Sequence, residues 1–282
     1  LLGAGTLSTY IITGAWSKAA AKEALRFGRV QSAFSGSGNR IPADEELEVI
    51  PETSYCAYCD NETIHGIEFE RVPVLKDAEA VPLVADMTSN FLTRPVDVHK
   101  FGLFYASAQK NLGIAGLAVI VLRRDLLGLA GTEVPTLLNY SVYSRTDSVP
   151  NTPPVFQLYV ANLMAQWIEA HGGVAVMDEY ARARAKIVYD AIDAMPEMYV
   201  SHVERESRSR VNAVFRLKDE ALTALFVKEA AEAGLANLAG HRAVGGIRAS
   251  MYNAMPIEGV QKLADFMKTF AHRHGRTQSA VN

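Results

Sequence analysis

Short apolar runs that end in polar residues recur through the first half of the chain. Residues 81–85 run into Asp86, residues 103–108 run towards Lys110, and residues 117–122 form a third run. Runs of this length, flanked by glycine, proline and charged residues, are typical of buried strands in an α/β sheet. Ligands of such sheets bind beyond the carboxyl ends of the strands, so the polar residues that follow these runs are the first candidates for a functional site.

Longer helices are predicted in the middle of the chain. Residues 139–154 are rich in Ser, Thr, Asp, Asn and Pro and predict a long loop. Apolar residues then recur at helical spacing over residues 155–170, and a pair of glycines ends the pattern. Residues 177–192 predict a second helix, and we expect its basic residues to lie on a solvated face: Arg182, Arg184 and Lys186.

The last third of the chain has a pattern typical of a small α+β unit. Strands are predicted over residues 211–217 and 246–252, and helices over residues 221–233 and 258–270. The tail from His274 is polar, and we expect it to fray.

Length and composition fit a soluble globular enzyme. The chain has 282 residues, of which 49% are apolar and 21% charged, with a net charge of −3. This balance excludes a general field for nucleic acid or anionic membrane, and the longest apolar run is too short to span a bilayer. We therefore predict a cytoplasmic α/β protein with a mainly parallel sheet in a large domain (residues 1–170) and a smaller C-terminal α+β domain (residues 171–282).

The chain has only two cysteines, Cys56 and Cys59, too few for a secreted disulfide framework. Their Cys-x-x-Cys spacing is shared with redox and zinc sites, but zinc needs two further ligands, and the near candidate is His65 alone. We therefore predict no metal site and two reduced thiols at the end of a strand.

Asp86 and Lys110 carry the central chemical argument. Each follows an apolar run, so parallel strands would bring both side chains to one edge of the sheet. One chemistry that needs this pair is a lysine that reacts with the aldehyde of pyridoxal phosphate, opposite an acid that keeps the pyridine nitrogen protonated. Spacing alone leaves an ordinary Asp–Lys pair near a loop as an equally good interpretation.

A set of short motifs favours the cofactor-binding interpretation of Asp86 and Lys110 over an ordinary Asp–Lys pair. They are Tyr58-Cys-Asp-Asn-Glu-Thr-Ile-His-Gly66, Ala85-Asp-Met-Thr-Ser-Asn90, Phe101-Gly-Leu-Phe-Tyr105, Ala106-Ser-Ala-Gln-Lys-Asn-Leu-Gly113, Asn151-Thr-Pro-Pro154, Gly240-His-Arg-Ala-Val-Gly-Gly-Ile-Arg248 and Tyr252-Asn-Ala-Met-Pro256. Together and in this order they resemble the phosphoserine aminotransferase family of class-V pyridoxal-phosphate enzymes. The resemblance implies the aspartate-aminotransferase fold (fold type I) and amino transfer from glutamate to 3-phosphohydroxypyruvate in serine biosynthesis. For a bacterial member, the resemblance further implies amination of a related phosphorylated hydroxy-keto acid in pyridoxine biosynthesis.

The resemblance also implies which residues bind the cofactor, pyridoxal 5′-phosphate. Lys110 would be the Schiff-base lysine and proton shuttle, Asp86 would pair with the pyridine nitrogen, and Trp16 would stack on the ring. The further cofactor contacts implied are Thr63, Gln109, Asn151 and Thr152. From the residues alone, Trp16 is better interpreted as a core tryptophan. Asn151-Thr-Pro-Pro154 equally predicts the start of a helix, with Asn or Thr as the cap and proline after it.

The implied substrate contacts are His241, Arg242 and Arg248. In the family the first two bind the substrate phosphate, which suits the forked donors of arginine, and the third binds the α-carboxylate. Residues matching Asn151, Thr152, His241 and Arg242 serve the neighbouring subunit's site, so the resemblance implies a homodimer with shared active sites. Without the resemblance, surface charge is the slightly better interpretation of His241 and Arg242.

Members of the family begin well upstream of the position that matches Leu1. Their extra segment carries a glycine-rich turn with an arginine for the cofactor phosphate, and a His–Arg pair for the substrate. Two alternatives follow: a truncated sequence of a normal enzyme, or a catalytically weak or silent member that acts only as a dimerising fold. A cysteine desulfurase is disfavoured because Cys56 and Cys59 precede Thr63, and an alanine–glyoxylate aminotransferase has no use for His241 with Arg242.

Overall fold

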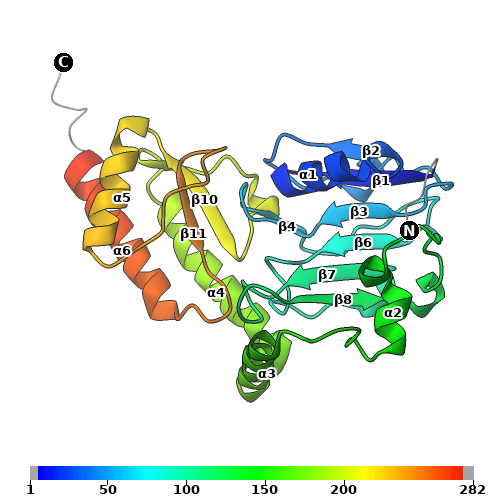
Figure 1. Ribbon diagram of the computed structural model, residues 1–282. Coiled ribbons are helices and arrows are strands. Elements are labelled where there is room, and N and C mark those ends of the chain that lie inside the picture. Colours follow the sequence, from blue (N-terminus) through cyan, green and yellow to red (C-terminus); the bar gives the residue numbers. More distant parts are fainter. Residues whose placement is uncertain (1–5, 276–282) are drawn as a thin grey trace.

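The computed structural model describes residues 6–275, and a six-stranded sheet is its largest element (Figure 1). The strand order is β2-β1-β3-β6-β7-β8. The strands are β1 (Leu7–Ile12), β2 (Arg29–Ser35), β3 (Cys56–Cys59), β6 (Leu83–Asp86), β7 (Leu103–Ser107) and β8 (Ala118–Leu122). Neighbours pair in parallel except β7 with β8, so the predicted mainly parallel sheet is confirmed.

Alternate residues of each strand point to opposite sides of the sheet, and apolar clusters cover both sides. Helix α1 (Ala15–Ala24) packs on one face against Tyr10, Tyr55 and Ala57. Ile11 lies on the other face, where a larger buried cluster is closed by irregular segments that supply Leu47, Phe69, Leu75 and Ala78. The α1 face is therefore less fully covered, and it is the face on which the cavity described below opens.

Strand β8 corrects the prediction of a third buried strand. Among residues 6–275 it pairs only with β7, in the antiparallel direction, and two of its large apolar residues are exposed: Ile120 by 41% and Val121 by 38%. An apolar run alone does not distinguish a central strand from an edge strand.

The predicted long loop before residue 155 is also wrong in part. It contains a short helix, α2 (Tyr140–Arg145), which begins where the Asn139 side chain accepts a hydrogen bond of 3.0 Å from Ser141 N. The polar composition of this segment predicts a loop, but one of its polar residues, Asn139, is the N-cap of a helix.

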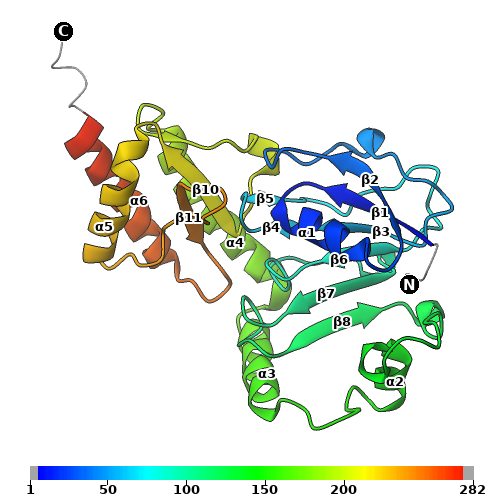
Figure 2. The ribbon, with the colours of Figure 1, turned by 45° about the horizontal axis from the view of Figure 1, so that its top comes forward.

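The C-terminal elements gather beside the large sheet (Figure 2). They form a three-stranded antiparallel sheet of β9 (Tyr199–Val200), β10 (Asn212–Leu217) and β11 (Ile247–Ser250), with helices α4 (Gly173–Asp193), α5 (Thr223–Glu232) and α6 (Ile257–His274). Helix α3 (Val155–Ala170) precedes them, and a small hairpin, β4 (Asn61–Glu62) with β5 (Ile67–Glu68), follows β3. The domain boundary at residue 170 stays a prediction.

Shorter helices and the chain ends complete the description. The 3-10 helices are Asp44–Glu46, Val98–Lys100, Arg124–Leu126, Thr136–Leu138, Arg205–Ser207 and Glu220–Leu222. Within residues 6–275, no helix combines the length and hydropathy that a membrane span requires. Of the tail expected to fray from His274, residues 276–282 lie outside the described part, and His274 itself ends α6.

Arg184 corrects the prediction of a solvated basic face on α4. Its residue surface is only 3% exposed, and its Nη1 donates to the main-chain oxygens of Asn253 (3.2 Å) and Met255 (2.9 Å). Arg182 and Lys186 are exposed and form ion pairs one helical turn away, as a solvated face requires. Arg184 therefore lies on the buried face of α4 and binds the main chain of residues 253–255, which follow β11.

A buried polar seam joins this segment to the large sheet. The Asn61 side chain donates to Asn212 Oδ1 (2.8 Å) and accepts from Ser209 Oγ (2.6 Å), and Asn253 N donates to Asn111 Oδ1 (3.0 Å). Buried amides paired in this way favour a single relative orientation of the elements that carry them. The seam therefore fixes β11 relative to the turn that carries Lys110.

Candidate active site

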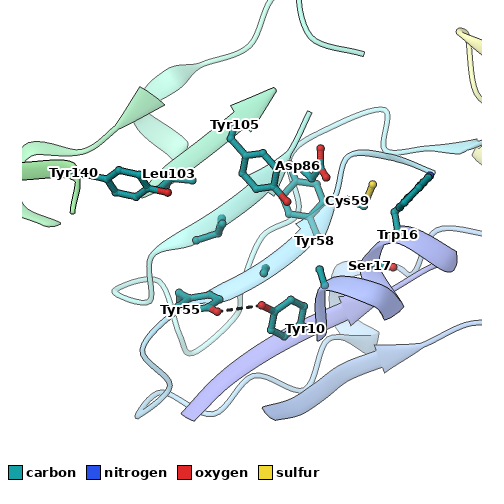
Figure 3. Close-up of a pocket in the computed structure, with 13 residues that line it drawn as sticks. Tyr10, Trp16, Ser17, Tyr55, Tyr58, Cys59, Asp86, Leu103, Tyr105 and Tyr140 are labelled. Atoms are coloured by element: carbon teal, nitrogen blue, oxygen red, sulfur yellow. Dashed lines mark hydrogen bonds between the residues drawn. The ribbon is translucent and has the colours of Figure 1, made fainter. Parts of the chain in front are cut away.

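A cavity of about 290 Å³ opens on the α1 face of the large sheet (Figure 3). Cys59 and Asp86, the last residues of β3 and β6, line it together with Tyr105 from the middle of β7 and Trp16 from the first turn of α1. Cys59, Asp86 and Tyr105 share one face because they are paired in register on neighbouring parallel strands. The position matches the rule that ligands of α/β sheets bind at strand ends.

Aromatic hydroxyls form the opposite end of the cavity. Tyr10 and Tyr55 are joined by a hydrogen bond of 3.0 Å, drawn as the dashed line in Figure 3, and Tyr140 of α2 lies nearby. Burial, together with the hydrogen bond to Tyr55, raises the pKa of Tyr10 well above its usual value. The tyrosine end of the cavity is thus neutral. The negative charge of the cavity lies at the other end, on Asp86.

Asp86 is held by two neighbours. Its Oδ1 accepts a hydrogen bond of 2.9 Å from Thr88 N, and the Tyr105 phenol lies beside the carboxylate. Burial, reinforced by the charge of Asp86, raises the pKa of Tyr105, so this phenol remains a donor at all ordinary pH values. Asp86 is therefore an oriented acceptor at the strand-end side of the cavity.

Lys110 lies in the turn after β7, and its Nζ donates to Thr63 Oγ1 over 2.9 Å. Burial lowers the pKa of this amine and the charge of Arg248 lowers it further, whereas Cys59 and Asp86 act in the opposite direction. A lower pKa increases the neutral, nucleophilic fraction of the amine near neutral pH. The structure brings Lys110, Thr63 and Asp86 to one edge of the sheet.

Arg248 approaches the same edge from β11. Its side chain is half-buried, and its Nε is buried with no hydrogen-bond partner among residues 6–275. Buried donors are almost always paired, so an open one beside a reactive amine marks a position for an acceptor such as a carboxylate.

Comparison with known proteins identifies the family. The sequence model described as "Aminotransferase class-V" matches residues 11–263. Phosphoserine aminotransferases of Chromobacterium violaceum and Laribacter hongkongensis are 45% and 46% identical over 278 residues, which span 98% of this chain and 76% of each relative. The chain belongs to the phosphoserine aminotransferase family.

Solved structures of the phosphoserine aminotransferase family share the fold. The enzyme from Bacillus circulans subsp. alkalophilus superposes with a TM-score of 0.92 at 40% identity, over 96% of this chain and 75% of that one. A phosphoserine aminotransferase from Trichomonas vaginalis, described as bound to PLP, gives 0.87 at 39% identity, over 94% and 76%. The predicted aspartate-aminotransferase type of fold is confirmed.

Of the residues that the family resemblance singled out, Trp16 and Asp86 line the cavity, whereas the others lie outside its lining, Lys110, Thr63 and Arg248 included. Gln109 is exposed, Asn151 and Thr152 are exposed in the coil before α3, and Arg242 is exposed in the loop before β11. His241 is half-buried, and its charge contributes to lowering the pKa of His65 after the larger effect of burial. Their roles stay predictions.

Two site residues have no role in the sequence-based account: Glu62 and Asn111. Glu62 is fully buried and binds the first turn of α1, and Asn111 connects the Lys110 turn to Asn253. Both stand inside motifs that were quoted for their neighbours Thr63 and Lys110. For Glu62 the available signal was a charged residue directly before Thr63, and for Asn111 it was an amide directly after Lys110.

Cys56 and Cys59 are free and buried. Burial raises the pKa of the Cys56 thiol to about 12, which makes it a poor nucleophile. The described residues contain no cluster of three or more His, Cys, Asp or Glu side chains placed to hold a metal ion.

Proposed function

We propose that this chain transfers an amino group from glutamate to 3-phosphohydroxypyruvate, giving phosphoserine and 2-oxoglutarate, with pyridoxal phosphate as cofactor. The observation that carries the proposal is Lys110, a half-buried amine with a lowered pKa, hydrogen-bonded to Thr63 at the same sheet edge as Asp86. Membership of the phosphoserine aminotransferase family supports the choice of substrates. The same groups would serve a related phosphorylated keto acid of pyridoxine biosynthesis.

The residues at the cavity fit a flat, phosphorylated aldehyde. Asp86 and Trp16, which line the cavity, would hold a proton at the pyridine nitrogen and offer an aromatic face. Lys110, outside the lining in the turn after β7, would supply the amine for covalent attachment. When bound, the cofactor ring accepts the electron pair released at the substrate Cα. Thr63 then orients the Lys110 amine, and the cofactor phosphate is assigned to Gln109 with Asn151 and Thr152 of a second subunit.

Two further groups act on the substrate. Arg248 binds the α-carboxylate with donors that include its unpartnered Nε, which fixes the Cα next to Lys110. Once the substrate amino group has displaced it from the cofactor, Lys110 Nζ would be free to take the proton from Cα, a task suited to an amine whose pKa lies below its usual value. Because glutamate delivers its amino group before the keto acid binds, the kinetics are ping-pong.

We propose a homodimer with shared active sites. Helix α3 and the coil just before it expose large apolar side chains: Val149, Val155, Phe156, Leu158, Tyr159 and Leu163. Apolar side chains gathered on one surface are typical of protein interfaces. Asn151 and Thr152 lie within this surface, so a second copy packed here supports their assignment to the neighbouring site.

The first test is an absorbance titration of the purified chain with pyridoxal phosphate, followed by glutamate. We expect a new absorption band on cofactor attachment to Lys110 and a second change when glutamate donates its amino group. A normal dimer that shows no band would instead support the alternative of a silent, dimerising fold.

Replacing Arg242 with alanine is expected to raise the apparent KM for the phosphorylated keto acid. A charge-assisted bond to phosphate contributes about 1.5–3 kcal/mol, which corresponds to a roughly 10- to 100-fold increase. The apparent KM for glutamate should change far less, because glutamate has no phosphate. Steady-state kinetics with both substrates measure the effect, and the exposed Arg182→Ala variant is the matched control. Equal effects on both substrates would remove Arg242 from the phosphate site.

A further inference from the structure

Glu62 on β4 is fully buried, and its carboxylate is bound by the first turn of α1. Trp16 N donates to Oε2 over 2.9 Å, and Ser17 N donates to Oε1 over 2.8 Å. The Ser17 hydroxyl adds a third bond of 2.6 Å to Oε1. The acid therefore accepts main-chain donors from a helix that begins more than forty residues earlier.

Helix α1 needs this external acceptor because it begins after Gly14, which has no side chain with which to cap it. The first N–H groups of a helix have no partner within the helix, and a capping side chain usually satisfies one of them. Here Glu62 accepts from Trp16 and Ser17, and His65 Nδ1 accepts from Ala15 N over 3.4 Å. The hairpin that follows β3 thus caps α1 from outside.

Gly14 gives the space that this arrangement requires. A Cβ at this position would lie 2.6 Å from Glu62 Cδ and 2.8 Å from His65 Nδ1, closer than real Cβ contacts. Any side chain at the cap position would therefore displace the acid that replaces it.

The carboxylate of Glu62 is matched to its donors. Burial raises the pKa of Glu62, and the hydrogen bonds from Ser17 and Trp16 oppose that rise. The ionised form accepts at both oxygens and lies at the positive end of the helix dipole. A neutral amide of the same shape offers one acceptor and one donor in place of two acceptors.

The Trp16 side chain is not held in place by burial. It is 47% exposed, whereas its main-chain N–H is fixed by Glu62. The next residue after Glu62, Thr63, accepts from Lys110 Nζ over 2.9 Å. Two consecutive residues therefore set the place of the aromatic face and the place of the reactive amine.

We propose that Glu62 is a positioning residue that holds the Trp16 indole at a fixed place relative to the Lys110 amine by capping α1. This inference rests on the proposed function in one respect, the stacking of Trp16 on pyridoxal phosphate. The capping geometry itself does not depend on the cofactor.

The experiment uses Trp16 as its own reporter. The chain has two tryptophans, so Trp167→Phe leaves Trp16 as the only one. In this background Glu62→Gln is expected to increase acrylamide quenching of Trp16 fluorescence in the cofactor-free chain. The affinity for pyridoxal phosphate should fall about tenfold, the effect of losing one hydrogen bond to a charged group.

Matched variants separate local positioning from general stability. Ser17→Ala removes the hydroxyl donor but leaves both main-chain donors, so it should shift quenching and affinity in the same direction by a smaller amount. Phe226→Leu weakens the aromatic core near α5 and α6, and it should leave Trp16 quenching unchanged.

Each outcome is decisive. Unchanged Trp16 quenching and cofactor affinity in folded Glu62→Gln would overturn the inference, and the same result in Ser17→Ala decides the matter if Glu62→Gln does not fold. If the parent chain itself binds no pyridoxal phosphate, the proposed function fails, but quenching in the cofactor-free variants still tests the role of Glu62.

Discussion

Replacing Lys110 with alanine is expected to abolish transamination, lowering kcat/KM by at least roughly a thousandfold. The variant lacks the amine that attaches to the cofactor and the base that takes the proton from the substrate Cα. The hydrogen bond to Thr63 is lost as well, but that bond lies at the edge of the sheet, so the secondary structure should persist. Steady-state rates, the absorbance titration and circular dichroism measure these three expectations.

Two further variants control this experiment. Lys100→Ala removes an exposed lysine from a 3-10 helix and should leave turnover unchanged. Lys110→Arg keeps a cation at the site but offers no amine for attachment, so it should be as inactive as the alanine variant. Turnover retained in either Lys110 variant would refute the assignment of this residue.

Replacing Arg94 with methionine is expected to destabilise the fold by about 3–5 kcal/mol, the effect of leaving a buried charge without its partner. Arg94 Nη2 binds both carboxylate oxygens of Asp60, over 3.0 and 2.8 Å, and the two side chains are 9% and 1% exposed. Asn90 provides a further donor to Asp60 (2.6 Å) but no charge. Urea denaturation at pH 8 measures the loss.

The loss should shrink as the pH falls. Burial raises the pKa of Asp60 and the charge of Arg94 opposes the rise, so removing Arg94 raises this pKa further. An acid whose folded pKa exceeds its unfolded value destabilises the fold fully above the folded pKa and not at all below the unfolded one. Denaturation at pH 5 should therefore show a smaller deficit than at pH 8, and Asp60→Asn in the Arg94→Met background should restore part of the stability. Equal deficits at both pH values would mean that Asp60 does not carry the effect.

The sequence predicted the elements that depend on the local spacing of apolar and polar residues. Apolar runs located β6 and β7, and strand-end polarity selected Asp86 and Lys110, which the structure brings to one edge of the sheet. Helical spacing placed α3 over residues 155–170, as observed. These features depend on local periodicity, which a single sequence contains.

Features set by distant partners were not accessible in this way. The pattern of β8 predicts a buried strand, but in the described part of the chain β7 is its one neighbour. The pattern around Arg184 predicts a solvated side chain, but Arg184 donates to main-chain oxygens about seventy residues away. The cap of α1 is supplied by Glu62 because Gly14 cannot supply it. In each case the deciding contact joins segments whose proximity only the fold determines.

Asn61, Glu62 and Thr63 are consecutive, yet each side chain is bound to a different part of the molecule. Asn61 binds the C-terminal elements, Glu62 binds α1, and Thr63 binds Lys110. An inserted or deleted residue here would exchange all three partners at once, because successive side chains point in different directions. A change of chain length within residues 61–63 is therefore expected to disturb the C-terminal elements, α1 and the Lys110 turn together, whereas a substitution at one of the three positions disturbs one of them.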